Sequence, residues 1–390
     1  MKVLGKKVML GFLGSLLLSS CVIKEGKSGG ETTLSGLDPA YFTTVIDGDT
    51  TRLIILENKN GMEVCLSNYG ARIVSMMVPD KEGKPVNVVL GFDSIQAYFP
   101  EVKLPKLGGT LGRYAGRIGY GRFILEGDTI DVTKNDFGHC LHSGSEDGDK
   151  GWQYKIFKIA EKNDSSVLMT FVSPDGENGF PGSIKANIRF TLTQNNSLRI
   201  NYSAVTDKPT VICLSNQSYF NLSGDPDNSV TDQRLNINAS SYLPVDSTRL
   251  VIGEICSVEG TPLDFREEKS IGRDIDNAWN EQIRYGRGYD HAFILDTRGD
   301  LTQKAVSLYC KKSGVEMNIF TTEPAIQFYS GNFLYSSLSR KQNENFSQRH
   351  GLSLEPLHYP DSPNHPEWPN VILLPGEEYN STTIYSFRCR

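Results

Sequence analysis

The sequence has no concentration of charge of either sign. Its 390 residues include 40 Lys and Arg against 46 Asp and Glu, a formal net charge of −6, and neither sign forms long blocks. A protein that binds nucleic acid through its phosphates needs a basic patch or stripe. We therefore expect no nucleic-acid partner.

The N-terminus has no apolar run long enough to span a bilayer. Three lysines precede an apolar run at residues 8–18, which is about half of the roughly 20 residues that a transmembrane helix needs. The run ends in Leu18-Ser19-Ser20-Cys21, which resembles a bacterial lipoprotein box. We interpret residues 1–21 as a lipoprotein signal peptide with Cys21 as the lipidated residue. The alternative is an ordinary secretory signal in which the cysteine is incidental.

The next segment, residues 22–40, has the composition of a flexible tether. It is rich in Lys, Gly, Ser and Thr and shows no hydrophobic periodicity. A single soluble domain is then expected over residues 41–390, held to a membrane of the bacterial envelope only through the lipid. Lys24-Glu25 is not an obvious surface-export sequence, so we expect the domain to face the periplasm.

Paired cysteines and nucleotide loops are absent as well. The six cysteines after Cys21 have neither Cys-x-x-Cys nor zinc-ribbon spacing, so no disulfide framework or structural zinc site is indicated. His139 and His142 flank Cys140, but no helical pattern places both rings on one face and no third ligand is near. No Gly-x-x-x-x-Gly-Lys-Ser/Thr motif occurs. We expect no metal and no cofactor.

What the sequence does contain is hydrophobic alternation of period two. Apolar and polar residues alternate along residues 184–192 and again along 198–204, with a turn between them. Residues 51–56 and 62–66 flank a hairpin signal, Asn58-Lys59-Asn60-Gly61. Strong helical periodicity is nearly absent. This pattern is typical of half-buried antiparallel strands and predicts an all-β fold.

Several polar and glycine-rich stretches are similar, in their order along the chain, to motifs of the aldose 1-epimerases (galactose mutarotases). The central stretch reads Leu214-Ser215-Asn216-Gln217-Ser218-Tyr219-Phe220-Asn221-Leu222 and follows an apolar strand. The others lie at residues 68–71, 112–118, 141–144, 173–182, 288–295, 323–334 and 350–364. The resemblance spans roughly residues 68–390.

The resemblance implies one large antiparallel β-sandwich, the galactose mutarotase-like supersandwich, with an aldohexose held in a cleft on a concave sheet face. It also implies roles for single residues. Glu355 falls on the catalytic base of the family, and His142 on a histidine that contacts substrate. Sugar-binding positions are occupied by Arg117, Asp290 and Gln327.

The general-acid histidine of the family is replaced here by Gln217. An amide can hydrogen-bond but cannot supply a proton on the catalytic timescale, whereas an imidazole titrates near neutrality. Three hypotheses follow. His142 acts as the acid, directly or through a water; the ring oxygen is polarised and takes its proton from water in a slow reaction; or the protein is a carbohydrate-binding lipoprotein without catalysis. We favour an epimerase.

Two pairs of carboxylates raise a further hypothesis, a glycoside-cleaving enzyme on the same fold. Such an enzyme needs two opposed carboxyl groups about 5 to 10 Å apart, and Glu355 with Asp290 is the pair that could provide them. Asp175 and Glu177 are also close in sequence, but they lie in a turn-rich loop, where we expect them to brace the loop.

Overall fold

The computed structural model describes residues 32–102, 106–144, 151–334 and 346–390. The predicted signal peptide, its Cys21, and residues 22–31 of the predicted tether therefore lie outside the described residues. Within the described ranges, no helix is both long enough and apolar enough to cross a membrane.

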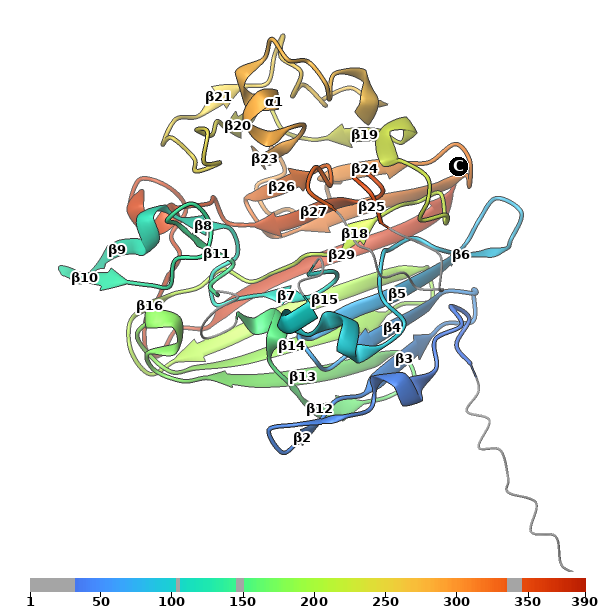
Figure 1. Ribbon diagram of the computed structural model, residues 1–390, viewed down its shortest axis with the longest axis horizontal. Helices are drawn as coiled ribbons and strands as arrows, with labels where there is room; N and C mark the ends of the chain where they lie inside the picture. The colour runs from blue at the N-terminus through green and yellow to red at the C-terminus, as the bar shows by residue number, and fades with distance from the viewer. Residues whose placement is uncertain (1–31, 103–105, 145–150, 335–345) are drawn as a thin grey trace, which may run out of the picture. The chain divides into compact units, whose positions relative to one another are not determined.

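A nine-stranded antiparallel sheet forms one side of the domain (Figure 1). The strands at one edge of this sheet, within residues 158–206, are green in the figure. The C-terminal strand, in red, lies at the centre of the sheet. In spatial order it consists of β12 (Lys158–Lys162), β13 (Ser166–Ser173), β14 (Ile184–Leu192), β15 (Ser197–Thr206), β29 (Tyr379–Cys389), β25 (Val315–Thr321), β24 (Val306–Tyr309), β19 (Arg234–Ile237) and β22 (Lys269–Ser270).

Two smaller antiparallel sheets complete the sandwich. The six-stranded sheet is ordered β18 (Tyr219–Phe220), β27 (Leu352–Leu357), β26 (Ala325–Tyr329), β23 (Asp290–Ile294), β20 (Ser241–Leu243) and β21 (Cys256–Ser257). The four-stranded sheet runs in chain order through β3 (Leu53–Glu57), β4 (Glu63–Ser67), β5 (Arg72–Pro79) and β6 (Pro85–Asn87).

Short pairs and helical turns connect these sheets. The pairs are β1 (Val45–Ile46) with β2 (Asp49–Thr50), β9 (Arg122–Leu125) with β10 (Asp128–Asp131), β8 (Arg117–Ile118) with β11 (Cys140–Leu141), β16 (Thr210–Val211) with β28 (Ile372–Leu373), and β7 (Thr110–Leu111) with β17 (Ser215–Asn216). Among the residues that the structure describes, the one α-helix is α1 (Glu281–Gly286). Short 3-10 helices cover Pro39–Phe42, Ile95–Tyr98, Pro100–Val102, Gly119–Gly121, Trp152–Tyr154, Glu177–Gly179, Val230–Asp232, Ile271–Arg273 and Ser362–Asn364.

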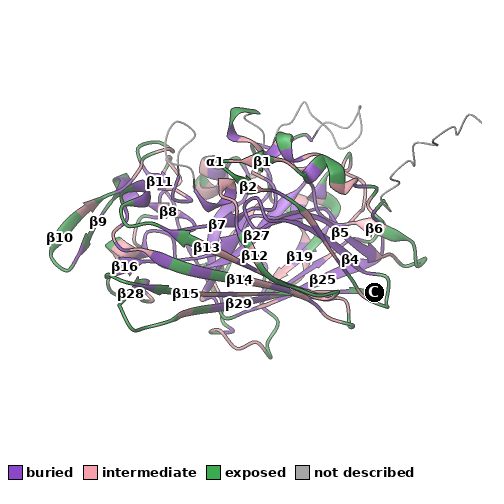
Figure 2. Cartoon of the chain, turned by 90° about the horizontal axis from the view of Figure 1, so that it is seen from below, coloured by how far each residue is buried: buried purple, intermediate pink, exposed green. Residues whose placement is uncertain are grey.

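The predicted strands and their alternation are confirmed. Every second residue of β14, from Ile184 to Leu192, is buried, and the residues between them are exposed or half-buried. The hairpin predicted at residues 51–66 is β3 paired with β4. One hydrophobic cluster joins side chains of all three sheets, for example Phe190, Leu354 and Val64, and Figure 2 shows this buried interior along the strands. The all-β sandwich therefore forms because each sheet buries one face.

The structured domain begins earlier than residue 41, so the predicted tether is too long at its C-terminal end. Leu37 is only 2% exposed. The backbone N–H of Leu34 donates to the Glu63 carboxylate at 2.8 Å, and that of Ser35 donates at 3.3 Å. Composition suggested a linker here, but one buried leucine and a buried carboxylate of β4 fix the segment to the four-stranded sheet.

A buried arginine joins two of the family-like loops. The Arg113 guanidinium donates to the carbonyls of Pro181 at 2.8 Å and Gly182 at 2.9 Å, and to the Ser173 hydroxyl at 2.6 Å. Burial lowers its pKa to about 10, so it stays charged at neutral pH. It thereby fixes the segment that leads into β8 and Arg117.

We expect Arg113→Met to lower the free energy of unfolding by about 3 kcal/mol, because several buried acceptors would lose their charged donor. Urea unfolding at pH 7 measures the change. Arg189→Met is the matched control, since Arg189 pairs with Glu161 at the surface and exposed pairs contribute about 0–1 kcal/mol. Equal losses in both variants would contradict the assignment.

The loop at residues 173–182 is braced by its carboxylates, as predicted. Glu177 pairs with Lys155 at 2.9 Å and accepts from the indole N–H of Trp152 at 3.3 Å. Asp175 accepts from the backbone of Gly182 at 2.7 Å and pairs with Lys208. Both carboxylates therefore hold the loop against its surroundings.

Candidate active site

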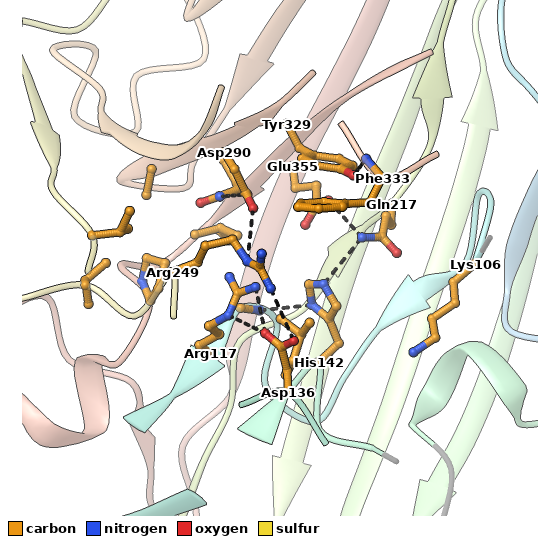
Figure 3. Close-up of a pocket in the computed structure, with 18 of the residues that line it drawn as sticks. Lys106, Arg117, Asp136, His142, Gln217, Arg249, Asp290, Tyr329, Phe333 and Glu355 are labelled. Carbon is orange, nitrogen blue, oxygen red and sulfur yellow. Dashed lines mark hydrogen bonds and ion pairs between the residues drawn. The ribbon is translucent and has the colours of Figure 1, made fainter. Parts of the chain in front are cut away.

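A cleft of about 410 Å³ opens on the six-stranded sheet, on the face that carries Glu355 (Figure 3). Its size is in the range of small-molecule sites. The structure brings together in it all six side chains that the sequence nominated: Arg117, His142, Gln217, Asp290, Gln327 and Glu355.

Strand alternation places the three sheet residues of the cleft. Leu352 and Leu354 of β27 face the core, so Glu355 faces the cleft. Gln327 is directly opposite Glu355 in the β26–β27 register. Its side-chain amide donates to Asp290 of the next strand, β23, at 2.7 Å. Asp290 is the diagonal neighbour of Gln327, which is itself opposite Ala292. Opposed and diagonal neighbours share one face of a sheet, so a row of polar groups crosses it.

Glu355 is a buried carboxyl group at the floor of the cleft. It is 2% exposed, and the amide of Gln217 donates to its Oε1 at 3.2 Å. Burial is the main cause that raises its pKa, to about 7, and the nearby Asp290 acts in the same direction. A group of this pKa exchanges protons readily at neutral pH, as a general base must.

Gln217 lies in the cleft, and both its backbone N–H and its backbone carbonyl are hydrogen-bonded. Its N–H donates to the carbonyl of Gly109 at 3.0 Å, and its carbonyl accepts from Gly108 at 2.7 Å. A side chain at either glycine would collide with neighbouring atoms, since a Cβ at Gly108 would lie 1.9 Å from the Ile73 carbonyl oxygen. The glycine-rich stretch is therefore required for close backbone approach beside Gln217.

His142 lies against Gln217 in one defined tautomer. The backbone N–H of Gly116 donates to its Nδ1 at 3.2 Å, so the proton of the neutral ring resides on Nε2. Nε2 is 3.3 Å from the Gln217 amide nitrogen. Both atoms are then donors, so they share no proton, and both N–H groups are available to an acceptor in the cleft.

Burial keeps the His142 ring neutral. It lowers the pKa well below the usual value, and the positive charges of Lys106 and Arg117 lower it further. The residue also adopts a left-handed backbone conformation, with φ 54°, which is uncommon outside glycine and is often found at functional sites. At neutral pH, His142 is therefore a hydrogen-bond donor and not a protonated acid.

Arg117 both lines the cleft and pairs with a carboxylate. Its Nη2 is 2.9 Å from Oδ2 of Asp136, and its Nε donates to the same oxygen at 2.9 Å. The Asp136 carboxylate holds the guanidinium in position while other N–H groups face the cleft, as Figure 3 shows. The structural and the sugar-binding interpretations of Arg117 are thus compatible.

Sequence reasoning missed several residues of the site, among them Asp136, Arg249 and Phe333. Arg249 Nη2 is 3.5 Å from Asp136, and its Nε is 3.9 Å from Oδ2 of Asp290. Phe333 borders the same part of the cleft. Arg249 and Asp136 lie in irregular segments without periodicity, so no pattern in the sequence indicated that they belong to the site. Phe333 lies inside a family-like stretch that could have drawn attention to it.

His139 and His358 do not line the cleft. His139 is buried and accepts from the Tyr120 backbone through Nδ1. His358 belongs to a cluster with Cys213 and Glu323, the one group of metal-ligating side chains found among the described residues. Burial alone would lower the His358 pKa, but Glu323, 2.7 Å away, contributes to raising it to about 10. The cluster already contains an imidazolium–carboxylate pair and is not part of the cleft.

Fold and cleft together define a carbohydrate-active β-sandwich protein, with an acid–base side chain at the centre of a row of sugar-compatible hydrogen-bonding groups. Comparison with known proteins identifies the family within this class. The model of the aldose 1-epimerase family matches residues 52–386, and the chain belongs to this family.

Relatives of known name and solved structures agree with this assignment. The chain is 39% identical to the aldose 1-epimerase of Escherichia coli K12, over 87% of this chain and 96% of the relative. It is 35% identical to the galactose mutarotase of Rattus norvegicus, over 84% and 91%. Similar structures include a galactose 1-epimerase from Lactobacillus acidophilus, with a TM-score of 0.75, 30% identity and coverage of 89% and 97%. An aldose epimerase homologue from C. elegans has a TM-score of 0.79, 28% identity and coverage of 87% and 99%.

Proposed function

We propose that this protein is an aldose 1-epimerase that interconverts the α and β anomers of hexoses such as galactose or glucose. The observation that supports this most is that one cleft holds the buried Glu355, with its pKa of about 7, the Gln217 amide in contact with it at 3.2 Å, and the His142 ring beside that amide. The reaction needs a base and a stabilised ring oxygen and no cofactor.

Glu355 is the base in this proposal. Its carboxylate takes the proton of the anomeric hydroxyl as the bond between C1 and the ring oxygen breaks. The free aldehyde turns about the C1–C2 bond, and ring closure from its other face returns the proton and gives the second anomer. Arg117, Asp290 and Gln327 hold the remaining hydroxyls, because each offers oriented donors or acceptors.

The departing ring oxygen receives two N–H donors, Gln217 Nε2 and His142 Nε2. Donors aimed at developing negative charge stabilise a transition state without transferring a proton. Because the His142 ring is neutral, we infer that water protonates the ring oxygen, and that the hydroxide so formed takes this proton back when the ring closes. The enzyme is then slower than one with a protonated acid at this place, since a general acid contributes about 10²–10⁴-fold.

The pH dependence of kcat/KM tests these roles. A base acts in its deprotonated form, so activity should rise with pH through about 7, the pKa of Glu355. Below that value it should fall about tenfold for each pH unit. No descending limb is expected between pH 7 and 9, because no protonated acid takes part. NMR exchange between anomers of glucose, corrected for each buffer blank, gives the profile.

A descending limb above neutral pH would contradict the water-protonation step and return His142 to the role of acid. The variant Gln217→His supplies the comparison in the same fold, since it should add such a limb.

Polarimetry of freshly dissolved α-galactose and α-glucose tests the function itself. The soluble domain from Thr32 should bring optical rotation to equilibrium faster than the buffer. If it binds these sugars without acceleration, the carbohydrate-binding alternative holds. Release of a reducing sugar from a glycoside would instead support hydrolysis by Glu355 and Asp290, which an epimerase never gives.

We also propose that the chain is a lipoprotein of the bacterial envelope, facing the periplasm and anchored through Cys21. The small residues before this cysteine and the preceding apolar run support it. Expression of the full chain with labelled palmitate should give a labelled protein in the membrane fraction. Cys21→Ala should lose the label, and retention of the label would refute the site.

A further inference from the structure

A second hollow lies directly beside the sugar cleft. It has a volume of about 430 Å³ and shares Arg249 and Phe333 with the cleft as a common wall. Its remaining lining comes from the loop after Asp136, from the turn that carries Arg249, and from α1 and the residue after it: Phe137, Ser247, Arg284, Tyr285 and Arg287.

The lining of this hollow is basic although the chain as a whole is acidic. It contains three arginines, at positions 249, 284 and 287, and no carboxylate, against a net charge of −6 for the chain. Arg249 is compensated by Asp136 and Asp290. Arg284 is 3.9 Å from Glu281. Within the described part of the chain, no carboxylate lies within ion-pair distance of Arg287. An excess of positive charge therefore faces the hollow.

Aromatic side chains at the rim suit a sugar ring. Phe137 is 66% exposed and Phe333 39% exposed, which is unusual for residues of this size. The guanidinium groups of Arg249 and Arg287 lie 5.1 and 5.2 Å from the Phe333 ring centre. These contacts hold both guanidinium groups and the ring beside one another. Apolar ring faces bordered by fork-shaped cations match a pyranose that carries an anionic group.

At its Arg249 wall, the hollow adjoins the side of the cleft that lies away from the Gln217 amide. Arg249 contacts Asp290 and Asp136, and Figure 3 shows Arg249 and Asp290 across the cleft from Gln217. A pyranose whose C1 is at Glu355 has its C4 hydroxyl at the opposite side of the ring. A residue attached through that hydroxyl would extend toward the hollow.

We propose that the hollow binds the uronate residue of an acidic oligosaccharide whose reducing-end sugar occupies the cleft. Arg284 and Arg287 receive the carboxylate, and Phe137 and Phe333 contact the ring. The enzyme then acts on the reducing ends of acidic saccharide fragments as well as on free hexoses. This substrate class rests on the epimerase function proposed above.

Two disaccharides that differ in one group test the proposal. Cellobiouronate and cellobiose have the same reducing glucose and linkage, and only the first bears a carboxylate. We expect kcat/KM for anomer exchange, measured by NMR, to be about tenfold higher for cellobiouronate, which corresponds to one well-formed charged contact. The preference should shrink in 0.5 M salt, which screens exposed charges.

The variant Arg284→Gln/Arg287→Gln should abolish this preference. Both side chains are at the surface, so folding should be retained, and the rate with glucose checks that the cleft is intact. Arg273→Gln, also an exposed arginine, is the matched control and should keep the preference. Equal rates for the two disaccharides in the native protein, or a preference that survives the double variant, would overturn the proposal.

Calorimetric binding separates failure of this proposal from failure of the proposed function. If glucose shows no catalysis, the native domain should still bind cellobiouronate about tenfold more tightly than cellobiose, and the double variant should not. Equal binding of both disaccharides rejects the uronate subsite whether or not the enzyme is active.

Discussion

Replacing Glu355 by glutamine is expected to reduce kcat/KM for anomer exchange by about 10²–10⁴-fold, to the level of the buffer blank. Glutamine has the shape of glutamate but cannot accept the proton of the anomeric hydroxyl. The contact with Gln217 at 3.2 Å can be retained as an amide–amide hydrogen bond. The loss should therefore reflect chemistry and not folding, and sugar binding should persist.

Polarimetry and NMR exchange with α-galactose give the rates, and calorimetry gives the binding. Glu378→Gln is the matched control, because Glu378 is exposed and does not line the cleft. It should be indistinguishable from the native protein. A Glu355→Gln variant that keeps even a tenth of native activity would remove Glu355 from the role of base.

The second large effect is expected from Gln217→His, which should raise kcat/KM by about 10²-fold or more. The new imidazole would lie beside Glu355, whose carboxylate lies within hydrogen-bond distance of the present amide. A nearby negative charge favours the protonated imidazole, so a proton donor would face the ring oxygen. The expected gain is the contribution of a general acid, in place of the protonation by water proposed for the native protein.

This result also distinguishes the hypotheses for the native protein. Gln194→His, in the exposed turn before β15, controls for an added histidine and should leave the rate unchanged. In the Gln217→His background, His142→Asn should cost little if His142 is only a hydrogen-bond donor. No gain in Gln217→His would mean that proton supply to the ring oxygen does not limit the reaction.

Much of the site was predictable because the relevant signals are local. The stretches around Arg117, His142, Gln217, Asp290, Gln327 and Glu355 resemble motifs of one family, and each motif fixes the position of its candidate residue. All six side chains meet in the cleft. Arg249 and Asp136 were not predictable, because their place in the site depends on contacts between irregular segments more than a hundred residues apart.

The tautomer and the protonation states of the site residues likewise could not be predicted from the sequence. The family resemblance could name His142 as a candidate acid, but only the backbone N–H of Gly116 fixes its tautomer, and only burial keeps its ring neutral. The same is true of Glu355, whose pKa of about 7 follows from the surrounding protein.

The sequence by itself determined the antiparallel strands, through the period-two alternation seen in β14 and β15, and the order of the motifs along the chain. Only the tertiary structure decided which face of β27 opens to the cleft, how the segment at Leu37 closes onto β4, and that three arginines surround a hollow beside the site. The physical reason is the distance along the chain between the residues that interact. Strand patterns arise from neighbours two residues apart, whereas burial, tautomers and charge clusters arise where distant segments meet.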